Sequence, residues 1–385
     1  MEQSSNQPYL TFIQACRESV AIYSSRAKAN HQDRSQSFCI HLSPESPESP
    51  QCVFVGIAGF DGHGPRGEIV AEIGLASMIS HLEKKTIEYT RLSDEEIQRD
   101  ITAAFAAAQE RIKTVCHSGG STCFITWAFV WEDGRDTTVY TANIGDSPVF
   151  TIEGDVTTQL TVDDSGTNPE ENSRLRAFGE NGMVAVWARQ GINTFRNPHV
   201  FLPSGELNPV GGKELGLTPN TMDGDYPTYW VNPNFYTHNK CVAVSRSFGN
   251  QDAECLGMIC EPHFTTRRVT PGSNVVIFGC TDGWKDIKKT DTIVGSVRSV
   301  LASSATAEEK AIALVTDGYA TYENLFYPRN YVAASGEHVS LPPLTEEQKR
   351  EVHSKWDDVT AGFMDCSKWP ARAAVSAAVP AADAP

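Results

Sequence analysis

Strand-like segments follow one another in groups along this chain, and longer helix-like segments separate the groups. β-Branched and aromatic residues predict strands near 18–25, 35–42 and 52–60, the last two as a hairpin. Two helices follow, and in the second of them Ser93 and Glu96 predict a capping box. Antiparallel strand groups interrupted by helical blocks do not suit a wound βαβ sheet, so the sequence predicts an α+β fold built of layers.

The second half of the chain continues this alternation. Short apolar runs broken by turn residues predict an antiparallel meander over 121–160, followed by a short helix over 169–178. Further strands are expected at 240–248, 273–280 and 356–364, and further helices near 290–302 and 306–320.

One long domain with accessory segments is the predicted organisation. Six prolines and many Asn and Gly residues between 195 and 238 predict an inserted flap rather than regular structure. The last residues, ARAAVSAAVPAADAP, are low in complexity. We therefore expect an N-terminal extension at 1–17, a single domain at 18–365 and a disordered tail at 366–385.

The net charge of −16 restricts the partners of this chain more than its fold. Nucleic acid is disfavoured, because its phosphates are held mainly by clustered Lys and Arg. The start, MEQSSNQPYL, lacks the features of an export signal, and apolar runs such as CFITWAFVW are too short to span a membrane. The 10 cysteines form no CxxC pair, which favours a reducing compartment. We expect a cytoplasmic or nuclear protein without membrane partners, and a monomer by default.

Two apolar runs of the sequence lead into an Asp-Gly pair. Asp61 and Gly62 follow VFVGIAGF, and Asp282 follows VVIFGCT, with Asp286 four residues further on. Such a pair at a strand end presents a carboxylate and a backbone carbonyl, and glycine has no side chain that would keep a ligand away. Each pair alone is a common turn dipeptide, so neither would identify a site by itself.

Two more aspartates occupy comparable positions. Asp146 follows the run TANIG, and Asp357 opens the last expected strand. Clustered carboxylates repel one another unless a cation lies between them, so convergence of these acids would favour Mg²⁺ or Mn²⁺. Zinc would call for more nitrogen or sulfur ligands. The ordered set, rather than any single acid, predicts a metal site.

Eight segments of the sequence, taken in their order along the chain, form a more specific pattern than any one of them alone. In chain order they are NHQDR (30–34), FDGHGPRG (60–67), GGSTCFITW (119–127), NIGDSPVF (143–150), TVDDSGTNPEENSRL (161–175), VAVSRSFGN (242–250), GCTDGWKD (279–286) and WDDVT (356–360). Together they resemble the motifs of the metal-dependent protein serine/threonine phosphatases of the PPM type, the protein phosphatase 2C group. The resemblance extends over roughly 18–365.

This resemblance implies a fold and a metal centre. The fold would be an α-β-β-α sandwich, in which two central antiparallel sheets pack face to face with helices outside each. Two Mg²⁺ or Mn²⁺ ions would be held by Asp61, the Gly62 carbonyl, Asp282 and Asp357. A weaker third ion would use Asp146, Asp286 and Asp282.

Three further residues would act on water and substrate. The resemblance implies that Asp33 holds a metal-bound water, and Lys28 stands where an arginine commonly grips the phosphate. The leaving group of phosphoserine or phosphothreonine is a strongly basic alkoxide that benefits from a proton donor. His63, beside Asp61, is suited to be that general acid.

The implied function is hydrolysis of phosphoserine and phosphothreonine in phosphoprotein substrates by a metal-bridging hydroxide, as in signalling by dephosphorylation. The chief alternative is a pseudophosphatase, a regulatory scaffold with little or no catalysis. The substitutions Lys28, Pro148 and Asn250 favour the scaffold, because they depart from the family pattern. The retained carboxylates oppose it, because a scaffold has no physical need for repelling acids. A third possibility, a hydrolase of nucleotides or small phosphate esters, is disfavoured by the acidic surface.

Overall fold

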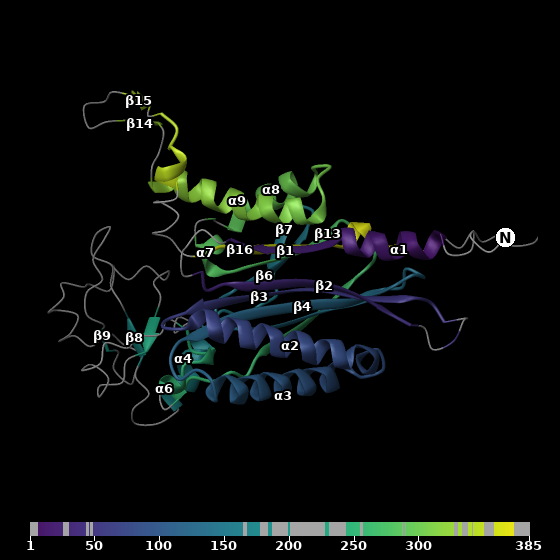
Figure 1. Cartoon of the computed structure of the whole chain (residues 1–385), viewed down its shortest axis with the longest axis horizontal. Helices are drawn as coiled ribbons and strands as arrows, with labels where there is room; N and C mark the ends of the chain where they lie inside the picture. The colour runs from purple at the N-terminus through teal and green to yellow at the C-terminus, as the bar shows by residue number, and fades with distance from the viewer. Residues whose placement is uncertain are drawn as a thin grey trace, which may run out of the picture.

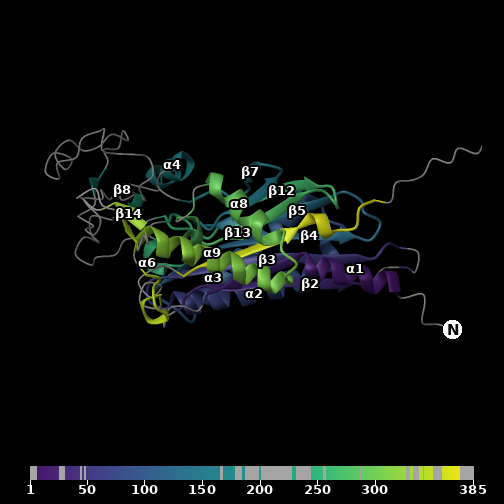
Figure 2. The same cartoon turned by 90° about the horizontal axis from the view of Figure 1, so that it is seen from above.

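Two antiparallel sheets lie face to face at the centre of this computed structural model, and helices cover the outer face of each (Figures 1 and 2). The structure describes residues 7–25, 31–43, 46, 49–164, 168–177, 184–186, 199–200, 228–230, 244–254, 257–286, 288, 290–326, 330–332, 338–340, 342–349 and 358–372. The predicted α+β class and its α-β-β-α layering are confirmed.

The first sheet has the strand order β1-β16-β13-β6-β7. Its strands are β1 (Val20–Ser24), β16 (Thr360–Asp365), β13 (Val275–Cys280), β6 (Val149–Glu153) and β7 (Val156–Gln159). The helices α8 (Thr290–Leu301) and α9 (Ala307–Phe326) lie on its outer face (Figure 1).

The second sheet has the order β12-β5-β4-β3-β2, with β11 paired to β4. Its strands are β12 (His263–Val269), β5 (Thr137–Ile144), β4 (Gly120–Trp131), β3 (Cys52–His63), β2 (Arg34–Leu42) and β11 (Phe248–Gly249). The helices α2 (Gly67–Tyr89) and α3 (Asp94–Lys113) cover its outer face (Figure 1).

Shorter elements complete the described chain. They are α1 (Gln7–Glu18), α4 (Pro169–Ala177), α6 (Gln251–Glu254), α7 (Asp282–Lys285), a 3₁₀ helix (Cys366–Lys368), a three-stranded sheet of β8 (Val184–Val186), β9 (His199–Val200) and β10 (Thr228–Trp230), and a hairpin of β14 (Asn330–Val332) and β15 (His338–Ser340). Most of the expected flap at 195–238 lies outside the described residues, as does the tail beyond 372.

The strand β3 shows why the layers form. Side chains alternate across a strand, and here both faces are apolar. Phe54, Ala58 and Phe60 pack in the cluster beneath α2 and α3, whereas Val55 and Ile57 pack between the two sheets. A strand that is buried on both faces has to lie at the centre of a layered fold.

The predicted capping box begins α3. The Ser93 hydroxyl accepts the backbone N–H of Glu96 at 3.3 Å, and the Glu96 carboxylate accepts the backbone N–H of Ser93 at 2.8 Å. These bonds satisfy backbone donors at the helix start that have no partner within the helix.

The meander predicted over 121–160 is wrong in one respect, because β4 and β5 belong to the second sheet while β6 and β7 belong to the first. The chain crosses between the sheets at residues 145–148. Gly145 has φ +85°, and a Cβ there would lie 2.3 Å from a methyl carbon of Thr122. Ser147 and Thr122 share a hydrogen bond of 2.8 Å between their hydroxyls. A turn this close to β4 directs β6 away from β5.

Packing continues on both sides of the expected domain at 18–365. Phe12 and Cys16 of α1 are buried in the core between the sheets. Trp369 lies in the same core, and its indole N–H donates to the Ser19 hydroxyl at 3.0 Å. The two ends of the described chain therefore contribute to the fold.

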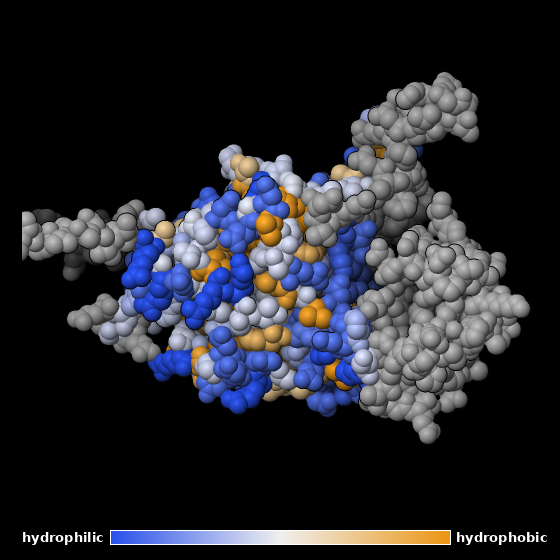
Figure 3. Space-filling model, turned by 180° about the vertical axis from the view of Figure 1, so that it is seen from behind, coloured by the Kyte–Doolittle hydropathy of each residue, from blue (hydrophilic) through white to orange (hydrophobic). Residues whose placement is uncertain are grey.

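The surface is mixed in character. On the face shown in Figure 3, hydrophobic residues are scattered among hydrophilic ones. Within the described residues, no helix combines the length and apolar character that a membrane span requires.

Candidate metal centre

Hydrogen bonds to one buried aspartate join the two sheets at one end. Asp33, which is 1% exposed, precedes β2 of the second sheet. Its Oδ2 atom accepts from the hydroxyls of Thr360 at 2.7 Å and Thr281 at 3.2 Å, which belong to the first sheet and its continuation. Thr281 and Thr360 also bond each other, since each backbone N–H donates to the other residue. This end of the sandwich is therefore fixed across the sheets.

Asp61 lies beside this junction. Because Arg34 of β2 pairs with Phe60 of β3, the preceding Asp33 lies next to Asp61. We expected the strand to end before the Asp-Gly pair, but β3 continues through His63, and Asp61 pairs with Thr122 of β4. The pairing fixes Asp61, which is 8% exposed, as part of the sheet.

Gly62 makes a close approach that requires glycine. A Cβ at this position would lie 2.6 Å from the carbonyl carbon of Gly67 and 2.7 Å from the carbonyl oxygen of Gln32. Backbone atoms cannot yield as a flexible side chain can. The first turn of α2 and the segment before β2 therefore meet directly over Gly62.

Asp282 follows the end of β13 in the first sheet. It begins α7 immediately after Thr281, the residue that bonds Asp33. The structure thus brings Asp33, Asp61 and Asp282 to the same end of the two sheets. Lys28 and Asp357 lie outside the described residues.

Asp358 is a further acid at this end that the sequence analysis did not include in the site. It is 3% exposed, and its Oδ2 atom accepts the backbone N–H of Gln32 at 2.7 Å. Its neighbour Asp357 was predicted as a ligand, but the sequence pattern gave no reason to choose the second acid as well.

Asp146 and Asp286 lie near a lysine. Asp146 is in the turn between β5 and β6, and Asp286 directly follows Lys285 at the end of α7. Burial raises the pKa of Asp146 to about 7, Lys285 opposes the rise, and the negative charges of Asp163 and Asp286 reinforce it. Lys285 forms an ion pair with Asp163.

His63 ends β3 in contact with Asn250. The Asn250 side-chain nitrogen donates to His63 Nε2 at 2.8 Å and to the Ser247 hydroxyl at 3.0 Å. A neutral His63 in this arrangement carries its proton on Nδ1. Gly120 makes room for the contact, because a Cβ there would lie 2.1 Å from the Asn250 nitrogen and 2.5 Å from His63 Nε2.

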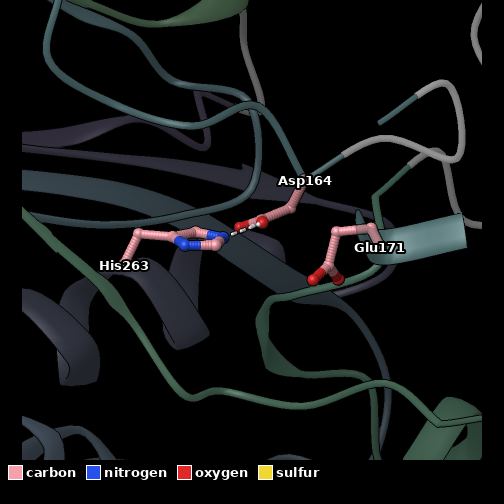
Figure 4. A group of neighbouring side chains, drawn as sticks. All are labelled: Asp164, Glu171 and His263. Atoms are coloured by element: carbon pink, nitrogen blue, oxygen red, sulfur yellow. Dashed lines mark hydrogen bonds and ion pairs between the residues drawn. The ribbon is translucent and has the colours of Figure 1, made fainter. Parts of the chain in front are cut away.

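Three side chains outside the expected site have the spacing of metal ligands: Asp164, Glu171 and His263 (Figure 4). His263 Nε2 lies 2.6 Å from Asp164 Oδ1. However, Arg246 contacts both acids, at 2.7 Å from Glu171 and 3.4 Å from Asp164, and Arg174 lies 2.6 Å from Glu171. The two guanidinium groups already compensate the two carboxylates, so this group is an ion-pair network.

The net pKa shifts of the two acids in this network have opposite signs. Burial raises the pKa of Asp164, against the hydrogen bond from His263. Burial also acts to raise the pKa of Glu171, but hydrogen bonds from Arg174, Arg246 and Ser245 outweigh it and lower that pKa to about 2. The network connects the chain before and within α4 to the segments on either side of α6.

A family model described as Protein phosphatase 2C matches residues 23–323, which is most of the chain. The chain belongs to the protein phosphatase 2C family. The family predicted from the eight sequence segments is therefore confirmed.

Relatives of this protein phosphatase 2C chain are distant. A probable protein phosphatase of Dictyostelium discoideum is 24% identical over 296 residues, covering 72% of this chain but only 25% of that protein. A probable protein phosphatase 2C of Arabidopsis thaliana is 22% identical over 276 residues, covering 69% of this chain and 68% of that protein. The crystal structure of a serine-threonine phosphatase 2C from Toxoplasma gondii aligns with a TM-score of 0.52 at 19% identity, over 89% of this chain and 93% of that chain. Such similarity shows the shared fold.

The donors around Asp61 fit a hard divalent cation. The carboxylates of Asp61 and Asp282 and the carbonyl of Gly62 are oxygen ligands, which Mg²⁺ and Mn²⁺ prefer. The tight packing at Gly62 excludes any side chain there, so the position requires glycine. Their role as ligands stays a prediction.

The ion-pair network gives a testable pH dependence. Because the pKa of Glu171 is lowered from 4.5 to about 2, its charge stabilises the fold above pH 4.5, and this contribution is lost as the pH falls toward 2. Glu171→Gln should lower the free energy of unfolding by about 3–5 kcal/mol near neutral pH, by removing one partner of buried ion pairs. Urea denaturation of both proteins at several pH values measures the difference, which should shrink below pH 4.5.

Glu170→Gln on the same helix is the matched control, because Glu170 is exposed. It should change stability by less than about 0.5 kcal/mol. A Glu171→Gln deficit that stays constant at every pH would contradict the lowered pKa.

Proposed function

We propose that this protein phosphatase 2C member is a metal-dependent protein serine/threonine phosphatase that acts on phosphoproteins. The observation that carries the proposal is the junction at Asp33. Its bonds to Thr281 and Thr360 bring acids of both sheets to one place, although carboxylates that lie together repel one another, a cost that a bound cation would offset.

In this proposal two Mg²⁺ or Mn²⁺ ions would be held by Asp61, the Gly62 carbonyl, Asp282 and Asp357. Such ions lower the pKa of coordinated water and neutralise phosphoryl oxygens during in-line displacement. Asp33 orients the attacking water, and the two threonine hydroxyls fix the Asp33 carboxylate for that task.

His63 would supply the proton that the leaving alkoxide needs. Asn250 donates to Nε2, so Nδ1 is the nitrogen that carries the transferable proton. Asn250 also holds the ring in place, because its nitrogen bonds Ser247 at the same time. The support for this role is the position of His63 at the end of the strand that contains Asp61.

Lys28 would contact the phosphate of the substrate. Lysine provides one compact charge rather than the bidentate contact of arginine. Its contact with a phosphate therefore constrains the orientation of the phosphate less. The acidic chain as a whole favours a basic phosphopeptide over a nucleotide as substrate.

Metal dependence is the first expected outcome. The full chain should hydrolyse a phosphothreonine peptide only with added Mn²⁺ or Mg²⁺, and Asp282→Asn should lower kcat/KM at least about a hundredfold, because a removed ligand charge weakens the electrostatic stabilisation. Phosphate release, measured with and without excess EDTA, checks both expectations.

Asp155→Asn is the matched control, because its side chain is 97% exposed and lies in the β6–β7 turn. It should keep full turnover. Turnover that persists in EDTA would contradict the metal mechanism. A folded protein with neither turnover nor Mn²⁺ binding would instead establish the scaffold alternative.

The general-acid role predicts a dependence on the leaving group. His63→Ala should lower kcat on a phosphothreonine peptide by about 10²–10⁴, the range for general acid catalysis, and should affect p-nitrophenyl phosphate much less. The p-nitrophenolate group leaves readily without a proton. Equal losses on both substrates would exclude His63 as the general acid. The control is His117→Ala, which changes an exposed histidine.

A further inference from the structure

Lys285 lies among acids that the family resemblance assigns to a weaker third ion. It is the last residue of α7, and Asp286 follows it directly. Its ammonium forms an ion pair with one carboxylate oxygen of Asp163. The other oxygen of Asp163 accepts from the side-chain nitrogen of Gln159 at 2.8 Å, which fixes the carboxylate.

Two hydrogen bonds between Gly145 and Asp164 bring Asp163 alongside Asp146. The N–H of Asp164 donates to the Gly145 carbonyl at 2.9 Å, and the N–H of Gly145 donates to the Asp164 carboxylate at 2.7 Å. Asp163 and Asp146 are the immediate neighbours of this bonded pair. Asp163 and Asp146 are thereby held near the end of α7, where Lys285 pairs with Asp163.

The charges agree with this geometry. The positive charge of Lys285 interacts favourably with the carboxylates of Asp163, Asp146 and Asp286. One tethered positive charge thus serves several carboxylates.

We propose that the Lys285 ammonium takes the place of the third divalent ion, so that this chain binds two ions rather than three. The inference rests on the proposed function, in which a two-ion centre at Asp61 and Asp282 does the chemistry. It adds that the neighbouring acids are neutralised by the chain itself.

The physical reason is competition for the same carboxylates. An ammonium offers three N–H donors and a positive charge to the surrounding oxygens. A divalent ion that entered beside it would be repelled by that charge. A tethered cation is also independent of metal concentration, so a chelator cannot remove it.

The test counts bound ions rather than turnover. Mn²⁺ is titrated into the full chain by calorimetry, and bound Mn²⁺ is counted after equilibrium dialysis. The wild-type chain should bind two ions and Lys285→Met three, with the third at least about tenfold tighter than any further binding to wild type. Lys285→Arg keeps the charge and should bind two.

Lys84→Met is the matched control, because it removes the same charge from an exposed position on α2. It should bind two ions. Thermal unfolding followed by circular dichroism shows that each variant is folded, which we expect for Lys285→Met because Asp163 is 32% exposed and can be solvated.

The other outcomes separate the two proposals. Three ions in the wild-type chain, or an unchanged count in Lys285→Met, would overturn the role of Lys285 and leave the phosphatase function intact. A wild-type chain that binds no Mn²⁺ would overturn the proposed function itself, and this inference with it.

Discussion

The hydrogen bonds that Asp33 accepts from Thr281 and Thr360 hold the two sheets in register at the end where the acids gather. The apolar core between the sheets, which includes Val55 of β3 and Ile277 of β13, sets their separation but specifies no chemistry. The hydrogen bonds at Asp33 also fix the sheets relative to each other at this end. They fix one acid of the second sheet against the residue that precedes Asp282, so the positions of both carboxylates depend on them.

Buried charge is offset in more than one way along this site. Arg174 and Arg246 compensate Glu171 and Asp164, and these ion pairs connect distant segments of the chain. Lys285 compensates the acids beside α7. In the proposed function, divalent ions offset the charges of the acids at the Asp33 junction. Each of these arrangements offsets the cost of removing a carboxylate from water, which amounts to several kcal/mol for a buried group that nothing compensates.

Local patterns made much of this structure predictable. The capping box at Ser93 and the apolar run of β3 depend on neighbours in the sequence, and both are confirmed. The strand β12 was not predicted, because Arg267 and Arg268 interrupt its apolar character on an exposed edge. Asp164 and His263 are 99 residues apart, so no local pattern could have joined them. The eight ordered segments predicted where the site lies. The ion pair of Lys285 near it could be recognised only from the fold.

The most direct measurement of the central claim is electron paramagnetic resonance of the full chain loaded with Mn²⁺. Two ions that share ligands at about 3.5–4 Å, the spacing of two-metal sites, give a spin-coupled spectrum distinct from that of isolated Mn²⁺. We expect the coupled spectrum for the wild-type chain and its loss in Asp61→Asn. A spectrum of isolated Mn²⁺ at saturation, or one that Asp61→Asn leaves unchanged, would contradict a shared metal centre at the Asp33 junction.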